Sequence, residues 1–230
     1  MILKTYMPAL FLLAANFAVA SAQVFTVPAV GLKSLQTMEV MSIELSPAKT
    51  VIRLSVENRI KGGTFCADRN IFIINPDGSK LKLEKASGIP NCPESYKFRK
   101  EGEILEFSLT FPALPSGTGW INLVEECSQN CFSVYGILLN NDFSRRIDEA
   151  ISNVDKGRMD SAIGLYTKLI QEAGPSEAGI LGSLYSDLIS LLAGKGYSAN
   201  AADWYRRLAA SDLPGKQMYI DNLNFRGIKF

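Results

Sequence analysis

The sequence predicts two domains: an all-β antiparallel sandwich followed by an all-α domain of helical hairpins. Through residues 26–139, apolar side chains alternate with polar ones in short stretches separated by turn residues. This period is that of a strand with one face in water. Further along, the spacing becomes helical, and one block of sequence occurs twice, at residues 162–175 and 201–214. Such a repeat indicates helical units that stack on one another.

The first residues have the pattern of a secretory signal peptide. Lys4 provides a short positive region, residues 8–19 form an apolar run, and the small residues Ala20 and Ala22 fit a cleavage site. The run is too short for a membrane anchor. We expect cleavage after Ala22 and a mature chain that begins at Gln23, with an uncleaved anchor as the alternative.

The sandwich is expected to contain about eight short strands, since alternating stretches recur between turn signals without any helical stretch. Such a series is typical of an antiparallel sandwich. The apolar positions of the three clearest strands are Ile52, Leu54 and Val56, then Leu81 and Leu83, then Phe107, Leu109 and Phe111.

Two local signals refine the strands. The Asn-Pro-Asp-Gly sequence at residues 75–78 predicts a hairpin turn, because Pro presets one dihedral angle and Gly accepts a positive φ. The alternation within residues 37–45 changes phase. We therefore expect a β-bulge near Val40 or Met41.

The C-terminal region is expected to form five helices. The first ends at Gly157, and Asp160 or Ser161 caps the second. The third and fourth cover residues 180–192 and 200–210. Apolar residues lie at helical spacing in the first helix, at Ile147, Ala150, Ile151 and Val154, and on one face of the second, at Ile163, Tyr166, Leu169 and Ile170. The last helix begins at Pro214, and its expected buried side consists of Met218, Ile220 and Leu223.

The chain has four cysteines, Cys66, Cys92, Cys127 and Cys131. In an exported chain an even number indicates two disulfides, and four cysteines allow three connectivities. We favour Cys66–Cys92 and Cys127–Cys131, because the second pair brackets a turn between two strands. A four-cysteine zinc site and a redox-active pair at Cys127 and Cys131 are the alternatives.

Catalytic motifs are scarce. The chain has no His, which excludes Ser-His-Asp, Cys-His and His-ligated metal sites. Ser46 and Lys49 match the S-x-x-K pattern of penicillin-binding enzymes, but they fit a turn between strands better. Glu125 and Glu126 are neighbours in a strand and point to opposite faces, so they cannot share a site. The sequence predicts no enzyme activity, no cofactor and no metal.

Charge limits the partners. The chain has 24 basic and 23 acidic residues, so it lacks the field that collects nucleic acids. No later stretch is apolar enough to span a membrane after signal cleavage. One basic cluster, Lys97, Arg99 and Lys100 with Tyr96 and Phe98 interleaved, could contact an acidic glycan or a lipid headgroup. The alternative is a solvated hairpin.

The repeated block in the helical region resembles tetratricopeptide repeats. Each copy has a small residue, an aromatic residue four positions on, and a closing proline. These residues are Ala162, Tyr166 and Pro175 in the first copy, and Ala201, Tyr205 and Pro214 in the second.

This resemblance implies a protein-binding scaffold whose concave face is lined by the first helix of each pair. On that face it places Ser183, Ser186 and Ser190, which lack the charge of the family's peptide-carboxylate clamp. Trp204 and Arg207 of the second copy are a further expected contact pair, because aromatic and Arg residues anchor interfaces. A helical domain that only packs on the sandwich is the alternative.

The N-terminal region loosely resembles the immunoglobulin-like sandwiches of exported bacterial envelope proteins. The likeness rests on residues 107–125, where an amphipathic strand, a Pro-rich turn and a second strand follow in order. Fold alone does not transmit function.

The expected organisation is a signal peptide over residues 1–22, a disulfide-bonded sandwich over residues 23–140 and a helical domain over residues 141–230. We expect an exported protein, periplasmic, on the outer surface or secreted, that acts as a non-enzymatic adaptor for protein partners. The competing expectation is a glycan- or small-molecule-binding protein that uses the loops around Cys66 and Cys92. The third expectation is an enzyme whose catalysis does not use His.

Overall fold

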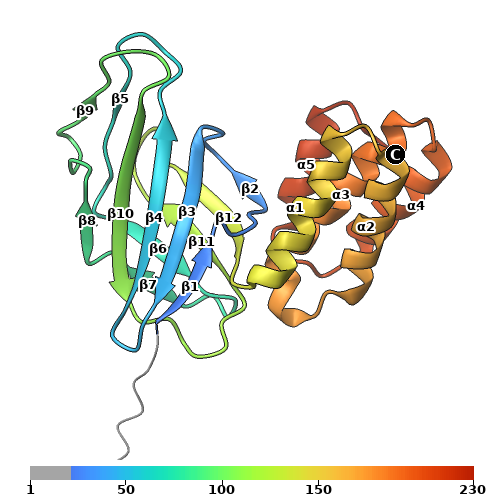
Figure 1. Cartoon of the computed structure of the whole chain (residues 1–230), viewed down its shortest axis with the longest axis horizontal. Coiled ribbons are helices and arrows are strands. Elements are labelled where there is room, and N and C mark those ends of the chain that lie inside the picture. Colours follow the sequence, from blue (N-terminus) through green and yellow to red (C-terminus); the bar gives the residue numbers. More distant parts are fainter. Residues whose placement is uncertain (1–21) are drawn as a thin grey trace, which may run out of the picture.

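The structure is a computed structural model and describes residues 22–230, so the expected signal peptide lies outside the described residues, apart from Ala22. An antiparallel β region comes first and five helices follow it (Figure 1). The strands of the described residues are β1 (Gln23–Thr26), β2 (Leu32–Lys33), β3 (Met38–Leu45), β4 (Lys49–Glu57), β5 (Thr64–Phe65), β6 (Ile71–Ile74), β7 (Lys80–Lys82), β8 (Lys85–Ser87), β9 (Tyr96–Lys97), β10 (Ile104–Pro112), β11 (Trp120–Glu125) and β12 (Ser133–Leu138). The helices are α1 (Asn141–Asp155), α2 (Met159–Glu172), α3 (Ala178–Gly194), α4 (Ser198–Ala210) and α5 (Lys216–Phe225), with a 3-10 turn, η1 (Pro175–Glu177), before α3.

Two five-stranded antiparallel sheets form the β region. The first sheet has the order β1-β3-β4-β10-β8 and the second has the order β2-β12-β11-β6-β7, while β5 and β9 form a separate ribbon. The expected number of strands, about eight, was too low. The strands that the sequence did not predict, such as β2, β5 and β9, are only two residues long, too short for alternation to be recognised.

The two sheets share one hydrophobic core. From the first sheet, Ile52 and Leu109 point inward and are fully buried, and from the second sheet Ile73 and Leu123 meet them. The period-two prediction is therefore confirmed for the long strands, because their alternate residues face the opposite sheet.

Both local predictions in the strands are confirmed. Residues 75–78 form the β6–β7 turn, with a φ of +84° at Gly78. The pairing of β3 with β4 shifts between Val40 and Ser42, which places the bulge at Met41.

Both predicted disulfides are present. Cys66 pairs with Cys92 and Cys127 with Cys131, at Cα–Cα distances of 5.3 and 5.6 Å. All four cysteines are therefore used, and none is left free for a zinc site. Paired cysteines fit an oxidising compartment and so an exported protein.

The helices follow the predicted order with two corrections. α2 starts at Met159, so Asp160 and Ser161 lie inside its first turn and do not cap it. Asp160 instead accepts a hydrogen bond from Lys195 in the next helical pair. Met218 was expected to be buried but is 37% exposed, whereas Ile220 and Leu223 of the same helix are buried.

Within residues 22–230, no helix combines the length and the apolar character needed to cross a bilayer.

The helical domain packs on the outer face of the second sheet, at β11 and β12 (Figure 1). Trp120 and Leu138 are buried there, and Leu138 belongs to the hydrophobic core of the helices. Four glycines allow this close approach. A Cβ atom added to any of them would lie under 3.0 Å from an atom of the other domain: Gly31, Gly119, Gly136 and Gly179.

Polar contacts also tie the start of the chain to α1. The backbone N–H of Ala29 donates to Oγ of the buried Ser144 at 3.1 Å. Nδ2 of Asn141 donates to the carbonyl oxygen of Val24 in edge strand β1 at 2.9 Å. The first turn of α1 is thus bonded to β1 and to the β1–β2 connection, while α3 packs on β11 and β12.

Candidate functional site

The outer face of the second sheet carries a row of apolar side chains. We call Phe72, Ile74, Val124 and Tyr135 the outer-face patch. Val124 is the direct cross-strand neighbour of Phe72, and Ile74 lies opposite Asn122. All four side chains are half-buried, yet none belongs to the core between the sheets or to the core of the helices. Among the described residues, Phe72, Ile74 and Val124 belong to neither hydrophobic core, whereas Tyr135 lies beside the helical domain.

Two lysines border the patch on edge strand β7. Lys82 and Lys80 lie opposite Phe72 and Ile74 in the strand register. Their amino groups are 5.9 and 5.2 Å from the centre of the Phe72 ring, close enough for attraction by the ring face. Lys80 also pairs with Glu126. The lysine stems therefore extend the apolar surface, while their charges stay at its rim.

The other border of the patch is formed by the helical domain. Tyr135 and Asn122 line a small cavity of about 30 Å³ together with Pro214 of the α4–α5 connection and Met218 of α5. Pro214 and Met218 are exposed to solvent. The apolar surface thus continues from the sheet onto the helices, so a partner seated on it would contact both domains.

The composition of this surface is similar to that of protein interfaces. Aromatic residues and Met are enriched at the centres of protein interfaces, and charges are confined to the rim. The patch and the adjoining Met218 have this arrangement, with Phe72 and Tyr135 inside and the lysines at the rim. A signal for it exists in the sequence, since Ile71–Ile74 is apolar at all four positions and so cannot have one wet, polar face.

The three serines predicted for partner binding do not form an open polar face. α3 is apolar on nearly all sides and packs against α2, α4, α5 and the second sheet. Ser186 is buried, and its hydroxyl donates to the carbonyl oxygen of Gly182 at 3.0 Å. Ser190 donates to the Ser186 carbonyl oxygen at 2.6 Å, and Ser183 is half-buried. Two of these hydroxyls therefore bond within their own helix.

Trp204 and Arg207, the other predicted pair, do lie together. The Arg207 guanidinium carbon is 4.6 Å from the centre of the Trp204 ring, and Arg207 pairs with Asp203 at 2.8 Å. Tyr185 of α3 meets the Trp204 ring edge-on at 5.6 Å. These side chains form a half-buried aromatic cluster on α3 and α4.

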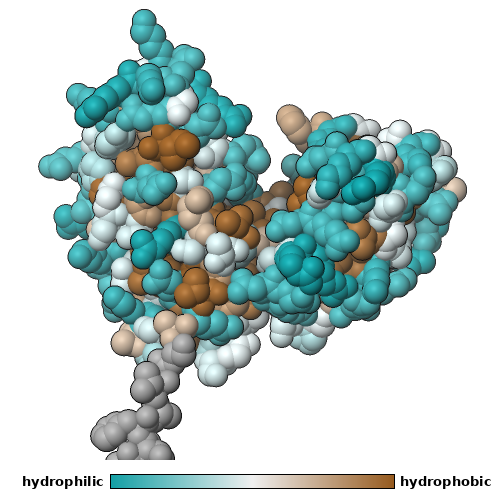
Figure 2. All heavy atoms as spheres, in the orientation of Figure 1, coloured by the Kyte–Doolittle hydropathy of each residue, from teal (hydrophilic) through white to brown (hydrophobic). Residues whose placement is uncertain are grey.

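A groove of about 620 Å³ opens at the junction of the domains. The β3–β4 turn, the β10–β11 loop, the start of β1 and η1 line it. Figure 2 shows hydrophobic surface on the side of the sandwich next to the helices. Among the described residues of the lining, Glu177 alone is ionisable. Its carboxylate already accepts hydrogen bonds from Asn140 Nδ2 and from the Gly174 N–H, at 3.1 and 3.0 Å.

A smaller pocket, of about 250 Å³, lies between the two disulfides. The buried Glu125 lines it and accepts hydrogen bonds from the backbone N–H groups of Asp68 at 2.7 Å and Phe132 at 3.1 Å. Burial raises the pKa of Glu125, and the two backbone hydrogen bonds oppose this shift. Through these two hydrogen bonds Glu125 joins the segment after Cys66 to the segment after Cys131. Glu126 is exposed on the opposite face, as predicted.

Among residues 22–230, no group of three or more Cys, Asp or Glu side chains is placed to hold a metal ion. Comparison of the chain with protein-family models, with curated proteins and with solved structures finds no match in any of the three.

Proposed function

We propose that the protein is exported to a bacterial envelope and acts there, without catalysing a reaction, as an interaction or assembly adaptor for protein partners. In this proposal the sandwich is immunoglobulin-like and the helices are a short tetratricopeptide-like domain. The N-terminal sequence pattern and the two disulfides support export.

The outer-face patch is the observation that carries the proposal. An apolar surface that no element of the fold covers costs free energy in water, and such surfaces commonly mark interaction sites. The apolar surface also continues from the patch onto the helical domain, because Tyr135 lines a cavity together with Met218 and Pro214. An adaptor needs a surface of this kind, and the packed junction gives it a fixed shape.

Site-specific crosslinking tests the proposal. A photo-reactive amino acid at Ile74 should give one defined protein adduct in cells that express the full chain. The same residue at Met41, which is 41% exposed on the outer face of the first sheet, should not give that adduct. Equal adducts at both positions, or none at Ile74, would count against the patch as the contact surface.

Substitution variants extend this test to the helical domain. Phe72→Ser should abolish the adduct if the sheet is the main anchor, whereas Met41→Ser should not. Trp204→Ala tests whether the predicted Trp204 and Arg207 pair contributes to the same partner. A far-ultraviolet circular dichroism spectrum of each variant shows whether the fold is kept.

The junction groove supports a second candidate function, binding of a glycan or another small molecule by the sandwich loops. Its volume of about 620 Å³ falls within the usual range of ligand sites, and such sites prefer domain interfaces. The pocket beside Cys66 and Cys92 is smaller than that range. A panel of mono- and disaccharides that raises the melting temperature of the native chain, but not of Ser116→Trp, would support this function.

A further inference from the structure

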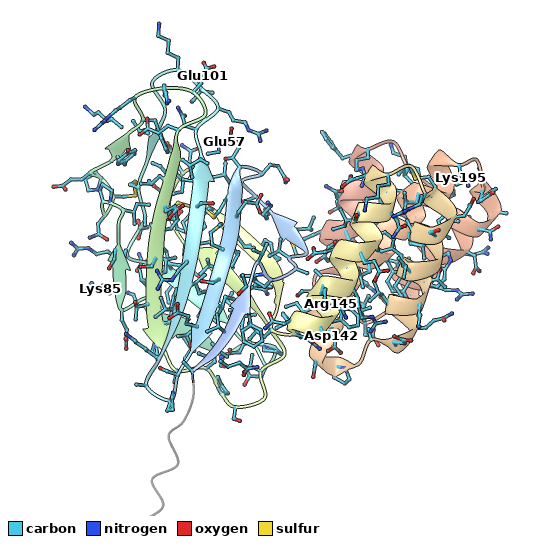
Figure 3. The ribbon with its side chains drawn as sticks, viewed as in Figure 1. Glu57, Lys85, Glu101, Asp142, Arg145 and Lys195 are labelled. Atoms are coloured by element: carbon cyan, nitrogen blue, oxygen red, sulfur yellow. A yellow bond between two sulfur atoms is a disulfide. The ribbon has the colours of Figure 1, made fainter. Side chains whose placement is uncertain are left out.

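The end of the sandwich opposite the start of β1 is formed by two loops. We call residues 58–63 and 97–103 the apical tip; Figure 3 labels Glu101 at this end, with Glu57 below it. The basic cluster that the sequence shows at Lys97, Arg99 and Lys100 lies here. The structure adds the Arg59-Ile60-Lys61 sequence of the other loop to it.

Asn58 holds the two loops together. It is 5% exposed, and its Nδ2 donates to the carbonyl oxygens of Ile60 at 2.8 Å and Lys100 at 2.9 Å. Its backbone N–H donates to the Glu103 carbonyl oxygen at 2.9 Å, and its own carbonyl accepts from Gly102 N–H at 2.8 Å. The apical tip is therefore a fixed structure that positions its exposed side chains.

Of the two acidic residues in the tip, Glu103 is held by hydrogen bonds within the tip and Glu101 is exposed. The Glu103 carboxylate accepts hydrogen bonds from the Tyr96 hydroxyl and the Arg99 N–H, each at 2.6 Å. The hydrogen bond from Tyr96, followed by that from Arg99, lowers the pKa of Glu103 below its ordinary value. Glu57, at the base, pairs with Arg59 at 3.1 Å. Glu101 remains exposed.

Positive charge and one apolar side chain point outward. Arg59, Lys61, Lys97, Arg99 and Lys100 are all exposed, against two acidic residues within the tip. Apart from Arg59, these basic residues form no ion pair with any residue from 22 to 230. Ile60 stands between Arg59 and Lys61 and is 65% exposed.

A bilayer surface with anionic headgroups can bind both the exposed basic side chains and the exposed isoleucine of the tip. Each Lys or Arg near such a surface gains about 1 kcal/mol, so about a fivefold increase in binding. The Ile60 side chain gains by leaving water for the boundary of the acyl chains. A hydrated acidic glycan would meet the same charges, but it offers nothing to an isoleucine between two cations.

We propose that the apical tip docks the protein on an anionic membrane surface, with Arg59, Lys61, Lys97, Arg99 and Lys100 facing headgroups and Ile60 entering the interface. This inference does not depend on the proposed adaptor function. Docking by the tip leaves the outer-face patch and the junction groove, which lie away from it, free for other partners.

Vesicle co-sedimentation of the full mature chain tests the proposal. Vesicles of phosphatidylcholine with phosphatidylglycerol should bind the protein, and vesicles of phosphatidylcholine alone should not. Lys61→Ala together with Lys100→Ala should weaken binding about 25-fold, from about fivefold for each lysine. Lys85→Ala is the control, because Lys85 is exposed on edge strand β8 away from the tip (Figure 3).

The isoleucine gives a second, separate readout. Ile60→Ser should weaken vesicle binding about tenfold at any salt concentration, since burial of apolar area is not screened. Ile151→Ser, at an exposed position of α1, is the control. In Ile60→Trp, the fluorescence of the new indole should shift to the blue on adding anionic vesicles.

Two results would overturn the proposal. One is equal sedimentation with both kinds of vesicle, or with neither at low salt. The other is binding of a soluble acidic polysaccharide, without vesicle binding, that is lost in the Lys61 and Lys100 variants but unchanged in Ile60→Ser. That result would assign the tip to a glycan.

Discussion

Gly136 of β12 and Gly179 of α3 meet backbone to backbone across the junction of the two domains. A Cβ atom at Gly136 would lie 2.1 Å from the carbonyl oxygen of Gly179, and Gly136 itself has a φ of +64°. A Cβ atom at Gly179 would in turn lie 2.4 Å from the indole of Trp120. The junction therefore depends on two positions where only glycine fits.

Gly136→Ala should destabilise the protein by about 2–4 kcal/mol, because it adds both a strained φ and a clash with backbone atoms. Gly164→Ala is the matched control. Gly164 lies inside α2 with nothing within 4 Å of an added Cβ atom, so this change should stabilise the helix by about 0.5–1 kcal/mol. Urea denaturation measures both. A neutral Gly136→Ala would show that the domains can separate without cost.

Asp187 should make the protein less stable as the pH rises. Burial raises the pKa of Asp187 from 3.8 to about 6; Arg226 and the Tyr166 hydroxyl oppose this shift, and Tyr219 is a further neighbour. The unfolded chain loses this proton at a lower pH than the folded protein does. Stability contributed by Asp187 is therefore present below pH 3.8 and is lost between pH 3.8 and about 6.

Asp187→Asn removes this penalty. The variant should be more stable than the native chain by up to about 3 kcal/mol at neutral pH, and the difference should vanish in acid. Denaturation by urea across this pH range measures the effect. Asp212→Asn, at an exposed position, is the control and should change little. A difference between Asp187→Asn and the native chain that does not depend on pH would contradict the assignment.

Glu125→Gln should destabilise the sandwich by about 1–3 kcal/mol, because an amide has one acceptor oxygen and one buried N–H would lose its partner. The two N–H groups belong to Asp68 and Phe132. Glu126→Gln, at the exposed position directly after β11, should cost much less. Hydrogen exchange should become faster at one of these two N–H groups in Glu125→Gln, and at neither in Glu126→Gln.

Removing the two disulfides should have unequal effects. Replacing Cys66 and Cys92 by Ser should cost about 3.5 kcal/mol, and replacing Cys127 and Cys131 about 2 kcal/mol, since the first bond closes the larger loop of the unfolded chain. Urea denaturation under oxidising conditions compares the two variants. Equal losses would indicate that residual structure in the unfolded chain, rather than loop size, sets the cost.

The long strands and the helices could be predicted because their burial follows one period. Ile52 and Leu109 lie on the inner side of β4 and β10 as their alternation indicates. The junction could not be predicted, since Gly136 and Gly179 differ from turn glycines only through atoms that are distant in sequence. Nothing local to either glycine indicates that another backbone passes within contact distance.

The candidate site was missed for a related reason. The resemblance to stacked repeats places the serines of α3 on an open face. In the structure this helix is enclosed on nearly all sides, and the Ser186 hydroxyl donates to the Gly182 carbonyl oxygen of the same helix. Trp204 and Arg207 do lie together, and their contact with a partner stays a prediction. The outer-face patch was overlooked although Ile71–Ile74 is apolar throughout, because a continuous apolar run in a strand suggests burial on both faces.

The hydrogen bond from Asn141 to Val24 has a consequence for biosynthesis. It joins residues 117 positions apart and covers part of the free edge of β1. A nascent chain emerges N-terminus first, so this edge stays open until α1 has been synthesised. Unpaired edges are templates for association between chains. The helical domain thus protects the edge of β1 from other chains only after α1 has been made. Products truncated before residue 141 lack this protection and should self-associate.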